Sequence, residues 1–364
     1  MAVRIATFNV ENLMERFDFS QRRKNKTSRG WGAPKMTPHE DDARQMTALA
    51  IADCQADVIC LQEVENLEAL EDFEQNYLAR MTGIDYPHKV WRQGNDGRGI
   101  DVALMARAAT TNGEEIEILD VVSHRKKSFA DLDVHSRELK VMGIERDERL
   151  FRRDCLDVDL RIGGKRMTIF VCHFKSMGGA REGLNGRDHT MPVRLAEARG
   201  VRRIVERKFG SERVANMRWM ICGDLNDYTE RLVVTGDRID GYGFDLKQES
   251  VSSLEPFFND DFCDDLVRRR PGDDRWTLFH AAGALKDLSR PEREVRHLVQ
   301  LDYMLMSPAL AKANAQAVPD ILRRGQPYRT VFPSAQNVDR YPRTGWDRPK
   351  ASDHCAVAVT LKMV

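Results

Sequence analysis

Short apolar runs that end in a carboxylate, an amide or an imidazole recur along the whole sequence and limit what this chain can fold into. Their length and their content of Val, Ile and Phe favour strands over helices. Because the runs are apolar on both faces, we expect strands covered by a second sheet on one side and by helices on the other. The runs are Val3–Phe8, Val58–Leu61, Ile100–Met105, Cys155–Leu160, Met167–Cys172, Trp219–Cys222, Leu301–Met306 and Ala356–Leu361.

Three segments between these runs predict helices. Thr37–Glu40 forms a capping box with proline at the first helical position, and a helix is expected from there to about Ile51. Asn66 is expected to cap a second helix, and Pro192 to open a third that stops at Gly210. We expect loops over the remaining long segments, which are Asp18–Ala33, Ser123–Asp154, Lys175–Thr190, Thr235–Asp261 and Arg268–Arg296.

The composition is that of a neutral globular protein, with 41% hydrophobic and 31% charged residues. Lys and Arg number 57, as do Asp and Glu, so the chain does not rely on bulk attraction to nucleic acid, although local basic patches stay open. Seven scattered cysteines without a Cys-x-x-Cys pair predict free thiols in a reducing, cytoplasmic setting. The N-terminal residues enter a strand at once, and no signal peptide or membrane span is expected. No linker-like stretch divides the chain, so we expect residues 1–364 to form a single domain with long loop insertions.

Oxygen-bearing side chains end the first two strands. Asn9 and Glu11 follow the first strand, and Glu63 follows the second. For any one of these residues alone, a strand end that turns into solvent is the simpler interpretation. Together they supply the hard oxygen ligands that Mg²⁺ or Mn²⁺ prefers, and we predict a metal site there.

His173 follows the strand Met167–Cys172, and Asp101 lies in the strand Ile100–Met105. A histidine in such a place is more often an ordinary core residue than a catalyst. A carboxylate on a neighbouring strand would change this, because it keeps the imidazole protonated. A pair between His173 and Asp101 is therefore our hypothesis for this strand end.

The segment from Gly223 to Asn226 carries the sharpest local signal. The glycine permits a tight turn, so that Asp224 and Asn226 can reach into one cleft. An aspartate there can activate a water, and an amide can orient a phosphoryl oxygen. The motif Gly-Asp-x-Asn also occurs in ordinary turns, so it indicates chemistry only together with the other strand ends.

An aspartate and an Asp-His pair occupy the last strand ends. If Asp302 accepts a hydrogen bond from His354, it fixes the tautomer of the imidazole and raises its basicity. Such a pair would also suit a serine nucleophile. No Gly-x-Ser-x-Gly elbow is present, and the abundance of carboxylates, Asp353 among them, favours a metal and a water instead.

The ordered motifs resemble the endonuclease/exonuclease/phosphatase family, which includes exonuclease III and DNase I, and most of all its bacterial nuclease-like members. The motifs run from Asn9 to His354, nearly the whole chain. The resemblance implies a four-layer α/β sandwich, in which two mainly antiparallel sheets pack face to face with helices outside. The motifs are Thr-Phe-Asn-Val-Glu-Asn, Leu-Gln-Glu-Val, Ile-Asp-Val-Ala-Leu, Cys-His-Phe-Lys-Ser, Gly-Asp-Leu-Asn-Asp, Leu-Asp-Tyr-Met-Leu and Ser-Asp-His.

The same resemblance implies a cofactor and its ligands. The cofactor would be Mg²⁺ or Mn²⁺, with Glu63 as its principal ligand. Asn9 and Glu11 would lie nearby, and Asp353 would support the metal region.

It also implies catalytic roles. Asp224 would position or deprotonate the attacking water, and Asn226 would contact the phosphate. His354, paired with Asp302, would stabilise the charged transition state. His173, backed by Asp101, would face the scissile phosphate from the other side. Whether Asp224 or His354 acts as the general base stays open.

Together these features predict a divalent-metal-dependent phosphoesterase that cleaves phosphodiester bonds in DNA or RNA. A phosphatase or phosphodiesterase for a small phosphorylated metabolite or a lipid headgroup is the alternative, which the neutral net charge favours. A non-catalytic binding module that keeps the fold is a third hypothesis. Trp276 could stack on a base or pack on the core. Residues that could hold a phosphate, or lie as ordinary surface charges, are Lys175, Ser176, Arg181, Arg187 and Arg194.

Overall fold

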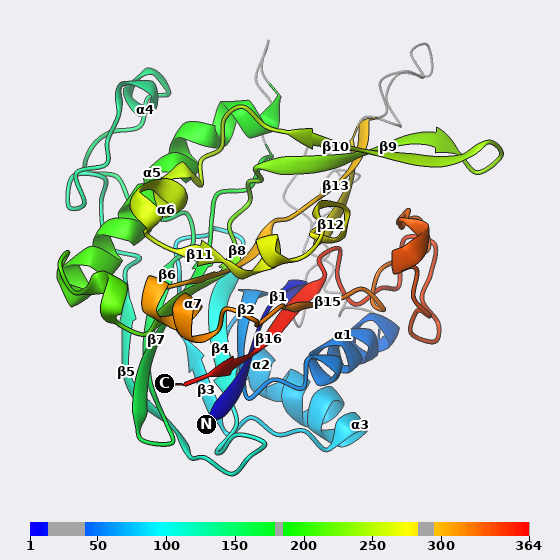
Figure 1. Ribbon diagram of the computed structural model, residues 1–364, viewed down its shortest axis with the longest axis horizontal. Helices are drawn as coiled ribbons and strands as arrows, with labels where there is room; N and C mark the ends of the chain where they lie inside the picture. The colour runs from blue at the N-terminus through cyan, green and yellow to red at the C-terminus, as the bar shows by residue number, and fades with distance from the viewer. Residues whose placement is uncertain (14–40, 179–184, 283–294, 364) are drawn as a thin grey trace, which may run out of the picture.

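Two six-stranded sheets lie face to face in this computed structural model, which describes residues 1–13, 41–178, 185–282 and 295–363 (Figure 1). The first sheet contains β1 (Ala2–Leu13), β2 (Val58–Val64), β3 (His88–Trp91), β4 (Asp101–Ala106), β15 (Asp320–Leu322) and β16 (Ala356–Lys362). The second contains β5 (Ile116–Ser123), β6 (Cys155–Ile162), β7 (Lys165–His173), β8 (Trp219–Asp224), β11 (Asp264–Asp265) and β14 (Asp302–Met306). A third sheet contains β9 (Glu230–Asp237), β10 (Gly241–Gln248), β12 (Leu278–Ala282) and β13 (Val295–Val299).

The strand order places the chain's two ends side by side in the first sheet, which runs β15-β16-β1-β2-β4-β3. The second sheet runs β11-β14-β8-β7-β6-β5, and the third runs β10-β9-β13-β12. Among the described strands, β1 pairs in parallel with β2, and β7 with β8. The other neighbours are antiparallel, as expected for this fold.

Helices cover the outer faces of both large sheets (Figure 1). The α-helices are α1 (Asp41–Cys54), α2 (Leu67–Phe73), α3 (Arg80–Thr82), α4 (Arg137–Val141), α5 (Gly186–Phe209), α6 (Glu255–Phe258) and α7 (Pro308–Ala313). A π-helical segment, η2 (Glu74–Ala79), joins α2 to α3. Short 3₁₀ helices are η3 (Val214–Asn216), η4 (Asn259–Asp261), η5 (Leu266–Arg269), η6 (Gly272–Asp274) and η8 (Ser334–Gln336).

Side chains alternate between the two faces of each strand, and this alternation builds separate cores. Inner-face residues such as Ile5 of β1 and Ile169 of β7 meet between the large sheets. The outer face of the first sheet, with Phe8, packs beneath α1 and α2. The outer face of the second, with Phe170, packs beneath α5. The layers are therefore helices, sheet, sheet and helices, and the prediction of a four-layer sandwich is confirmed.

The helix predictions are confirmed in part. The side chain of Asn66 accepts a hydrogen bond from the backbone of Ala69 and caps α2, and α5 ends at Gly210 as expected. The expectation that Pro192 opens this helix is wrong, because α5 begins one and a half turns earlier behind an Asn185 cap. That cap satisfies the helix start, so Pro192 lies inside the helix and removes only one backbone donor. The capping box at Thr37–Glu40 lies outside the described residues.

Two expected loops contain strands instead. Thr235–Asp261 contributes to the hairpin of β9 and β10, and Arg268–Arg296 contains β12 and the start of β13. Polar residues interrupt the apolar alternation in both segments, so their strand character is weak in the sequence alone. The expected loop Ser123–Asp154 contains α4, and Asp18–Ala33 lies outside the described residues.

All seven cysteines are free, and six of them are buried. In the described parts of the chain, no helix is both long and apolar enough to cross a membrane.

β8 packs so closely against β7 at Gly223 that a side chain there should destabilise the fold. Its φ of 145° and a Cβ that would lie 1.9 Å from the carbonyl oxygen of Cys172 leave no room for a side chain. We expect Gly223→Ala to lower the free energy of unfolding by about 2 kcal/mol or more, through overpacking and backbone strain. Chemical denaturation measures this, with Gly97→Ala as the control, because a Cβ at Gly97 would meet no atom of a non-neighbouring residue within 4 Å. Equal stability of the two variants would contradict the expectation.

Candidate active site

The strand register brings polar side chains together at one end of the sandwich. In the second sheet, Asp224 is opposite His173 of β7 and opposite Asp302 of β14. In the first sheet, Asn9 of β1 is opposite Gln62 of β2. All five residues continue the inner faces of their strands, where the hydrophobic core between the sheets ends. The candidate active site therefore lies at this end of the inner core.

Asp224 lies at the centre of the site and is 2% exposed. Its Oδ2 accepts hydrogen bonds from Nδ2 of Asn9 at 3.1 Å and from Nδ2 of Asn226 at 2.9 Å. Burial is the main cause that raises the pKa of Asp224 to about 7, since the positive charge of His354 opposes it only in part. A carboxylate with a pKa near neutrality can accept a proton from water.

Asn226 makes its hydrogen bonds within the protein. Its Nδ2 also donates to the backbone oxygen of Phe174 at 3.2 Å, and its backbone N–H donates to Oδ1 of Asp224 at 2.9 Å. The amide hydrogens are therefore engaged within the protein. Asn226, which has a φ of 51°, holds the carboxylate of Asp224, and its contact with a phosphate stays a prediction.

His354 and Asp302 form the hydrogen bond that the sequence predicts, with 2.8 Å between Nδ1 and Oδ2. Burial by itself lowers the pKa of His354, but the charges of Asp302 and Asp224 outweigh it, and the pKa lies well above its usual range. The other ring nitrogen, Nε2, lies 3.8 Å from Oδ2 of Asp224. The site thus holds an imidazolium next to the buried carboxylate.

The hypothesis of a pair between His173 and Asp101 is wrong. Nε2 of His173 faces Asp224 at 3.5 Å and Glu63 at 3.9 Å, and Nδ1 is buried with no hydrogen-bond partner among the described residues. Asp101 lies on the same face of β4 as Ala103, which packs against the outer helices, so Asp101 does not face the inner core. Burial, followed by the charge of Arg153, lowers the pKa of His173 well below its usual range, and the ring is neutral instead of protonated.

Asp101 belongs to a separate buried group. Its carboxylate accepts a hydrogen bond from the backbone of Gly94, and burial raises the pKa of Asp101 to about 7. Because it has no contact with His173, it has no role in orienting that ring.

Glu63 and Asp353 form the acidic side of the site. Oε2 of Glu63 accepts a hydrogen bond from the backbone of Asn12 at 3.0 Å, where β1 bulges. Burial, followed by the negative charge of Asp353, raises the pKa of Glu63. Burial also acts to raise the pKa of Asp353, but the positive charges of His354 and Lys350 outweigh it, and the pKa of Asp353 is lowered.

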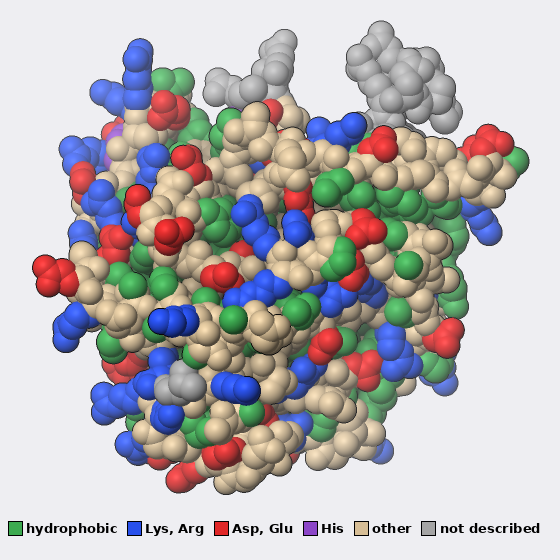
Figure 2. Space-filling model, in the orientation of Figure 1, with side chains coloured by type: hydrophobic (Ala, Val, Ile, Leu, Met, Phe, Trp, Pro, Cys, Tyr) green, Lys and Arg blue, Asp and Glu red, His purple; other side chains and the backbone are tan. Residues whose placement is uncertain are grey.

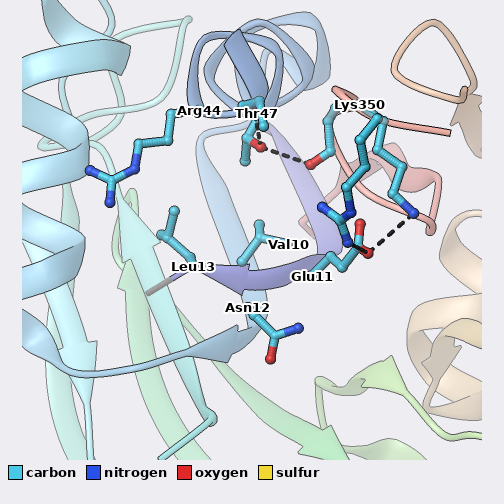
Figure 3. A pocket seen from close by; sticks show the side chains of 10 residues that line it. Val10, Glu11, Asn12, Leu13, Arg44, Thr47 and Lys350 are labelled. Carbon is cyan, nitrogen blue, oxygen red and sulfur yellow. Dashed lines mark hydrogen bonds and ion pairs between the residues drawn. The ribbon is translucent and has the colours of Figure 1, made fainter. Parts of the chain in front are cut away.

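Glu11 is occupied by cations of the protein itself. Its Oε1 lies 2.5 Å from Arg348 and 3.1 Å from Lys350, and Figure 3 shows the side chain turned toward Lys350 and away from Asn12. Its Oε2 accepts a hydrogen bond from the backbone of Asp353 at 3.1 Å. Glu11 therefore fixes the loop that carries Asp353, and its role as a metal ligand stays a prediction.

The remaining donors fit a divalent cation. Within the described ranges, no group of three or more His, Cys, Asp or Glu side chains is arranged to hold a metal. The site offers the carboxylates of Glu63 and Asp353 and the amide of Asn9, and the charge of Asp353 raises the pKa of Glu63 as expected for two acids that share one space. Mg²⁺ is commonly held by one or two carboxylates and several waters, so this smaller set is sufficient.

Two residues that the sequence did not single out support the site. Ser352 donates from Oγ to the backbone oxygen of Asn9 at 2.7 Å and accepts from the backbone of His354 at 3.0 Å. Arg153, which is 2% exposed, donates to the backbone oxygen of Phe174. Ser352 could have been found from its place in the Ser-Asp-His motif. Arg153 lies in an expected loop and gave no such signal.

Two of the residues that could hold a phosphate are engaged within the protein. Arg187 binds Asp227 and Glu249, and Arg194 is 0% exposed and binds backbone oxygens. Both stabilise the start of α5 and are not free for a substrate. Trp276 is 2% exposed and packs in the core, which confirms the second of its two interpretations. Arg181 lies outside the described residues.

A family model for the endonuclease/exonuclease/phosphatase family matches residues 4–236. The chain belongs to this family. Its members are phosphoesterase hydrolases that generally use divalent metals, so the chain is a phosphoesterase. A search among curated proteins finds no match.

Solved structures of the family share the fold of this chain. D. rerio TDP2 complexed with single strand DNA product is 12% identical, with a TM-score of 0.51 over 100% of this chain and 99% of that chain. The human Nocturnin catalytic domain with a bound sulfate anion is 13% identical, with a TM-score of 0.50 over 100% and 95%. A mannosyl-6-phosphatase of Bacteroides thetaiotaomicron is 13% identical, with a TM-score of 0.50 over 99% and 100%. At these identities the likeness establishes the fold alone.

The pair of His354 and Asp302 predicts a pH dependence of stability. The folded-state pKa of His354 is raised, so its stabilisation is complete below the unfolded value of about 6.5 and is lost as the pH rises through the folded value. We expect Asp302→Asn to lower the free energy of unfolding by about 3 kcal/mol at acid pH, and by less at alkaline pH.

Urea denaturation across a pH series, with EDTA present, measures this difference. The matched control is Asp320→Asn, since Asp320 forms an exposed ion pair with Arg4 and should contribute at most about 1 kcal/mol at any of these pH values. A loss in Asp302→Asn that does not change with pH would show that the two side chains are not coupled as an ion pair.

Proposed function

We propose that this phosphoesterase hydrolyses phosphodiester bonds of nucleic acid with the help of Mg²⁺ or Mn²⁺. The observation that carries the proposal is the arrangement of Asp224, whose pKa is about 7, beside the imidazolium of His354 at 3.8 Å. A buried group that can take a proton and a buried cation that can meet negative charge are the two functions that hydrolysis of a phosphate ester requires.

The protonation states favour one of the two candidate bases. His354 is already protonated, so it cannot accept a proton from water, whereas Asp224 can. In the proposed mechanism Asp224 removes a proton from the attacking water, and His354 stabilises the charge that develops on the phosphoryl oxygens. Asn9 and Asn226 hold the carboxylate of Asp224 in place by their hydrogen bonds. Nε2 of His173 lies 3.5 Å from the same oxygen of Asp224, Oδ2, and in the proposed mechanism this neutral ring donates to the phosphate.

A divalent cation would be held by Glu63, Asp353 and Asn9. When bound, it would neutralise charge on the phosphoryl group as a Lewis acid. The bridge from Glu11 to the backbone of Asp353 keeps one of these carboxylates in position.

Nucleic acid is the proposed substrate because exposed cations surround the acidic centre. The side chain of Arg98 is 57% exposed, forms an ion pair with Asp96 at 3.1 Å and has a charge that acts on Glu63. The side chain of Arg348 is 48% exposed and binds Glu11. Cations placed there can contact phosphates on either side of the one that is cleaved. D. rerio TDP2, which has the same fold, is complexed with single strand DNA product, and this supports the same substrate class for this chain.

A small phosphorylated molecule is the second candidate. It is supported by the mannosyl-6-phosphatase of the same fold and by a net charge of zero. Release of inorganic phosphate from sugar phosphates, without cleavage of oligonucleotides, would favour this candidate. We further propose that residues 1–364 act as one domain in the cytoplasm, since all seven thiols are free.

Catalysis by this site is tested with labelled single- and double-stranded oligonucleotides and Mg²⁺ or Mn²⁺. We expect Asp224→Asn to lower kcat by about 10²–10⁴-fold, because the base is lost. His354→Ala should lower kcat by about 10²–10³-fold, because the negative charge that develops on the phosphate is no longer stabilised. The control is Asp147→Asn, an exposed aspartate in the segment between β5 and β6. Wild-type rates in either site variant at saturating metal would exclude the mechanism.

Metal binding has a test that does not depend on turnover. A ligand that binds only the native state raises its melting temperature, so we expect Mg²⁺ or Mn²⁺ to raise the Tm of the wild type by roughly 2 °C or more at saturation. Glu63→Gln should abolish this shift, and EDTA should reverse it in the wild type. Glu212→Gln, at an exposed position, serves as the control. An equal rise of Tm in Glu63→Gln would show that the metal binds outside this site.

A further inference from the structure

A second cavity of about 360 Å³ lies between the hairpin of β9 and β10 and the segment that follows β15. In Figure 1 the hairpin extends above the orange-red segment, and in Figure 2 hydrophobic side chains lie along its underside. The residues that line the cavity are mainly arginine and aromatic. They include Arg238, Arg340, Tyr242, Tyr328, Phe332 and Trp346.

The cavity is positively charged. No Asp or Glu is among the described residues that line it, and of its arginines Arg329 is paired, with Asp347 at 2.6 Å. Within the described residues, Arg238 makes no hydrogen bond or ion pair with any other group. Arg340 donates to the backbone oxygens of Gln326 and Thr330 and has no carboxylate partner in the same ranges. Two guanidinium groups thus lack an acidic partner, which favours an anionic ligand.

Two aromatic rings of the cavity are exposed, and Arg340 lies against one of them. The guanidinium of Arg340 lies 4.8 Å from the ring centre of Tyr328 and 4.5 Å from that of Phe332. Tyr328 is 55% exposed and Trp346 is 63% exposed, although large aromatic side chains usually bury most of their area. Exposed rings next to unpaired arginines can take the faces of nucleic-acid bases and the phosphates between them.

The loop that carries Trp346 also reaches the active site. Its backbone is held to the cavity wall, since the N–H of Arg329 donates to the oxygen of Trp346 at 2.8 Å. A turn follows, in which the N–H of Gly345 donates to the oxygen of Pro349 at 2.9 Å. Arg348, two residues beyond Trp346, binds Glu11 in the active site at 2.5 Å. Two residues span at most about 7 Å, so the cavity lies within a few nucleotides of the acidic centre.

We propose that this cavity is a binding subsite for unpaired bases of a single-stranded nucleic acid whose scissile phosphate lies at the active site. The subsite deepens the proposed function and rests on it for the identity of the polymer. Stacking on Trp346 and Tyr328 holds the bases, and Arg238 and Arg340 contact the phosphates. Double-stranded nucleic acid offers no free base faces, so the subsite favours single strands or frayed ends.

Binding is measured first, by fluorescence anisotropy with a labelled oligodeoxythymidine of about ten nucleotides in EDTA, so that no cleavage occurs. We expect Trp346→Ala and Arg238→Gln, which change opposite walls of the cavity, each to weaken binding by about tenfold. Arg238→Gln should also reduce the slope of log K against log salt by about 0.7, since one phosphate contact is lost. Arg166→Gln is the matched control, because Arg166 is an exposed arginine at the opposite end of β7 from His173.

Turnover of bis(p-nitrophenyl) phosphate separates the subsite from the active site, because this substrate has no strand to place in the cavity. Unchanged turnover in both variants, together with a higher KM for the oligonucleotide, supports the proposal.

Wild-type oligonucleotide binding in both variants overturns the subsite and leaves the proposed function standing if the wild type cleaves the strand. A parallel loss of turnover on both substrates shows that the variants disturb the active site, and this result also overturns the subsite. If the variants lose binding but the wild type cleaves neither substrate, the subsite stands and the proposed function fails. Competition by thymidine monophosphate as strong as that by the oligonucleotide assigns the cavity to a free nucleotide and overturns the proposal.

Discussion

The hydrogen bond from Asn9 to Asp224 joins the two large sheets at the point where their shared core ends. Asn9 continues the inner face of β1 and Asp224 that of β8, so the bond forms only when both sheets have packed in register. A one-residue slip in either strand would turn one of these side chains to the outer face. Asp224 would then lose a donor, and a buried carboxylate would be left less satisfied. The packing of the sandwich and the geometry of the catalytic group are therefore one constraint.

The charges around this bond are arranged in two zones. On one side the imidazolium of His354 is held by Asp302 and lies next to Asp224. On the other, Glu63 and Asp353 lie close enough to affect each other's charge. Glu11, which would otherwise add a third carboxylate, is neutralised by Arg348 and Lys350 and instead fixes the backbone of Asp353. Two carboxylates then remain in the acidic zone, which suits the divalent cation that we propose there.

Local patterns were enough to predict most of the sandwich and most of the site. His173, Asp224 and Asp302 directly extend apolar runs, so strand parity places them on the inner face, as for Asp224 after Cys222. The separation of His173 from Asp101 could not be predicted, because β4 is buried on both faces, and its residues alone do not show that Asp101 lies on the outer face with Ala103. Nor could the partners of Glu11 be predicted, since they come from a loop far along the chain. The strands β9 and β10 were missed because their side chains alternate only in part, and with them the cavity wall that they form.

The proposed nucleic-acid substrate has to be reconciled with a chain of 57 basic and 57 acidic residues, and the local distribution of charge allows this. Most of its arginines are engaged within the protein; Arg187, for example, holds Asp227 at the start of α5. Such pairs cancel in the far field and contribute little to attraction at a distance. Figure 2 shows acidic and basic side chains interspersed over one face, which agrees with this cancellation. Arg238 and Arg340 differ, because no carboxylate among the described residues balances them and aromatic rings lie beside them. In our proposal, recognition occurs at short range, through stacking and individual phosphate contacts, and a net charge of zero does not argue against it.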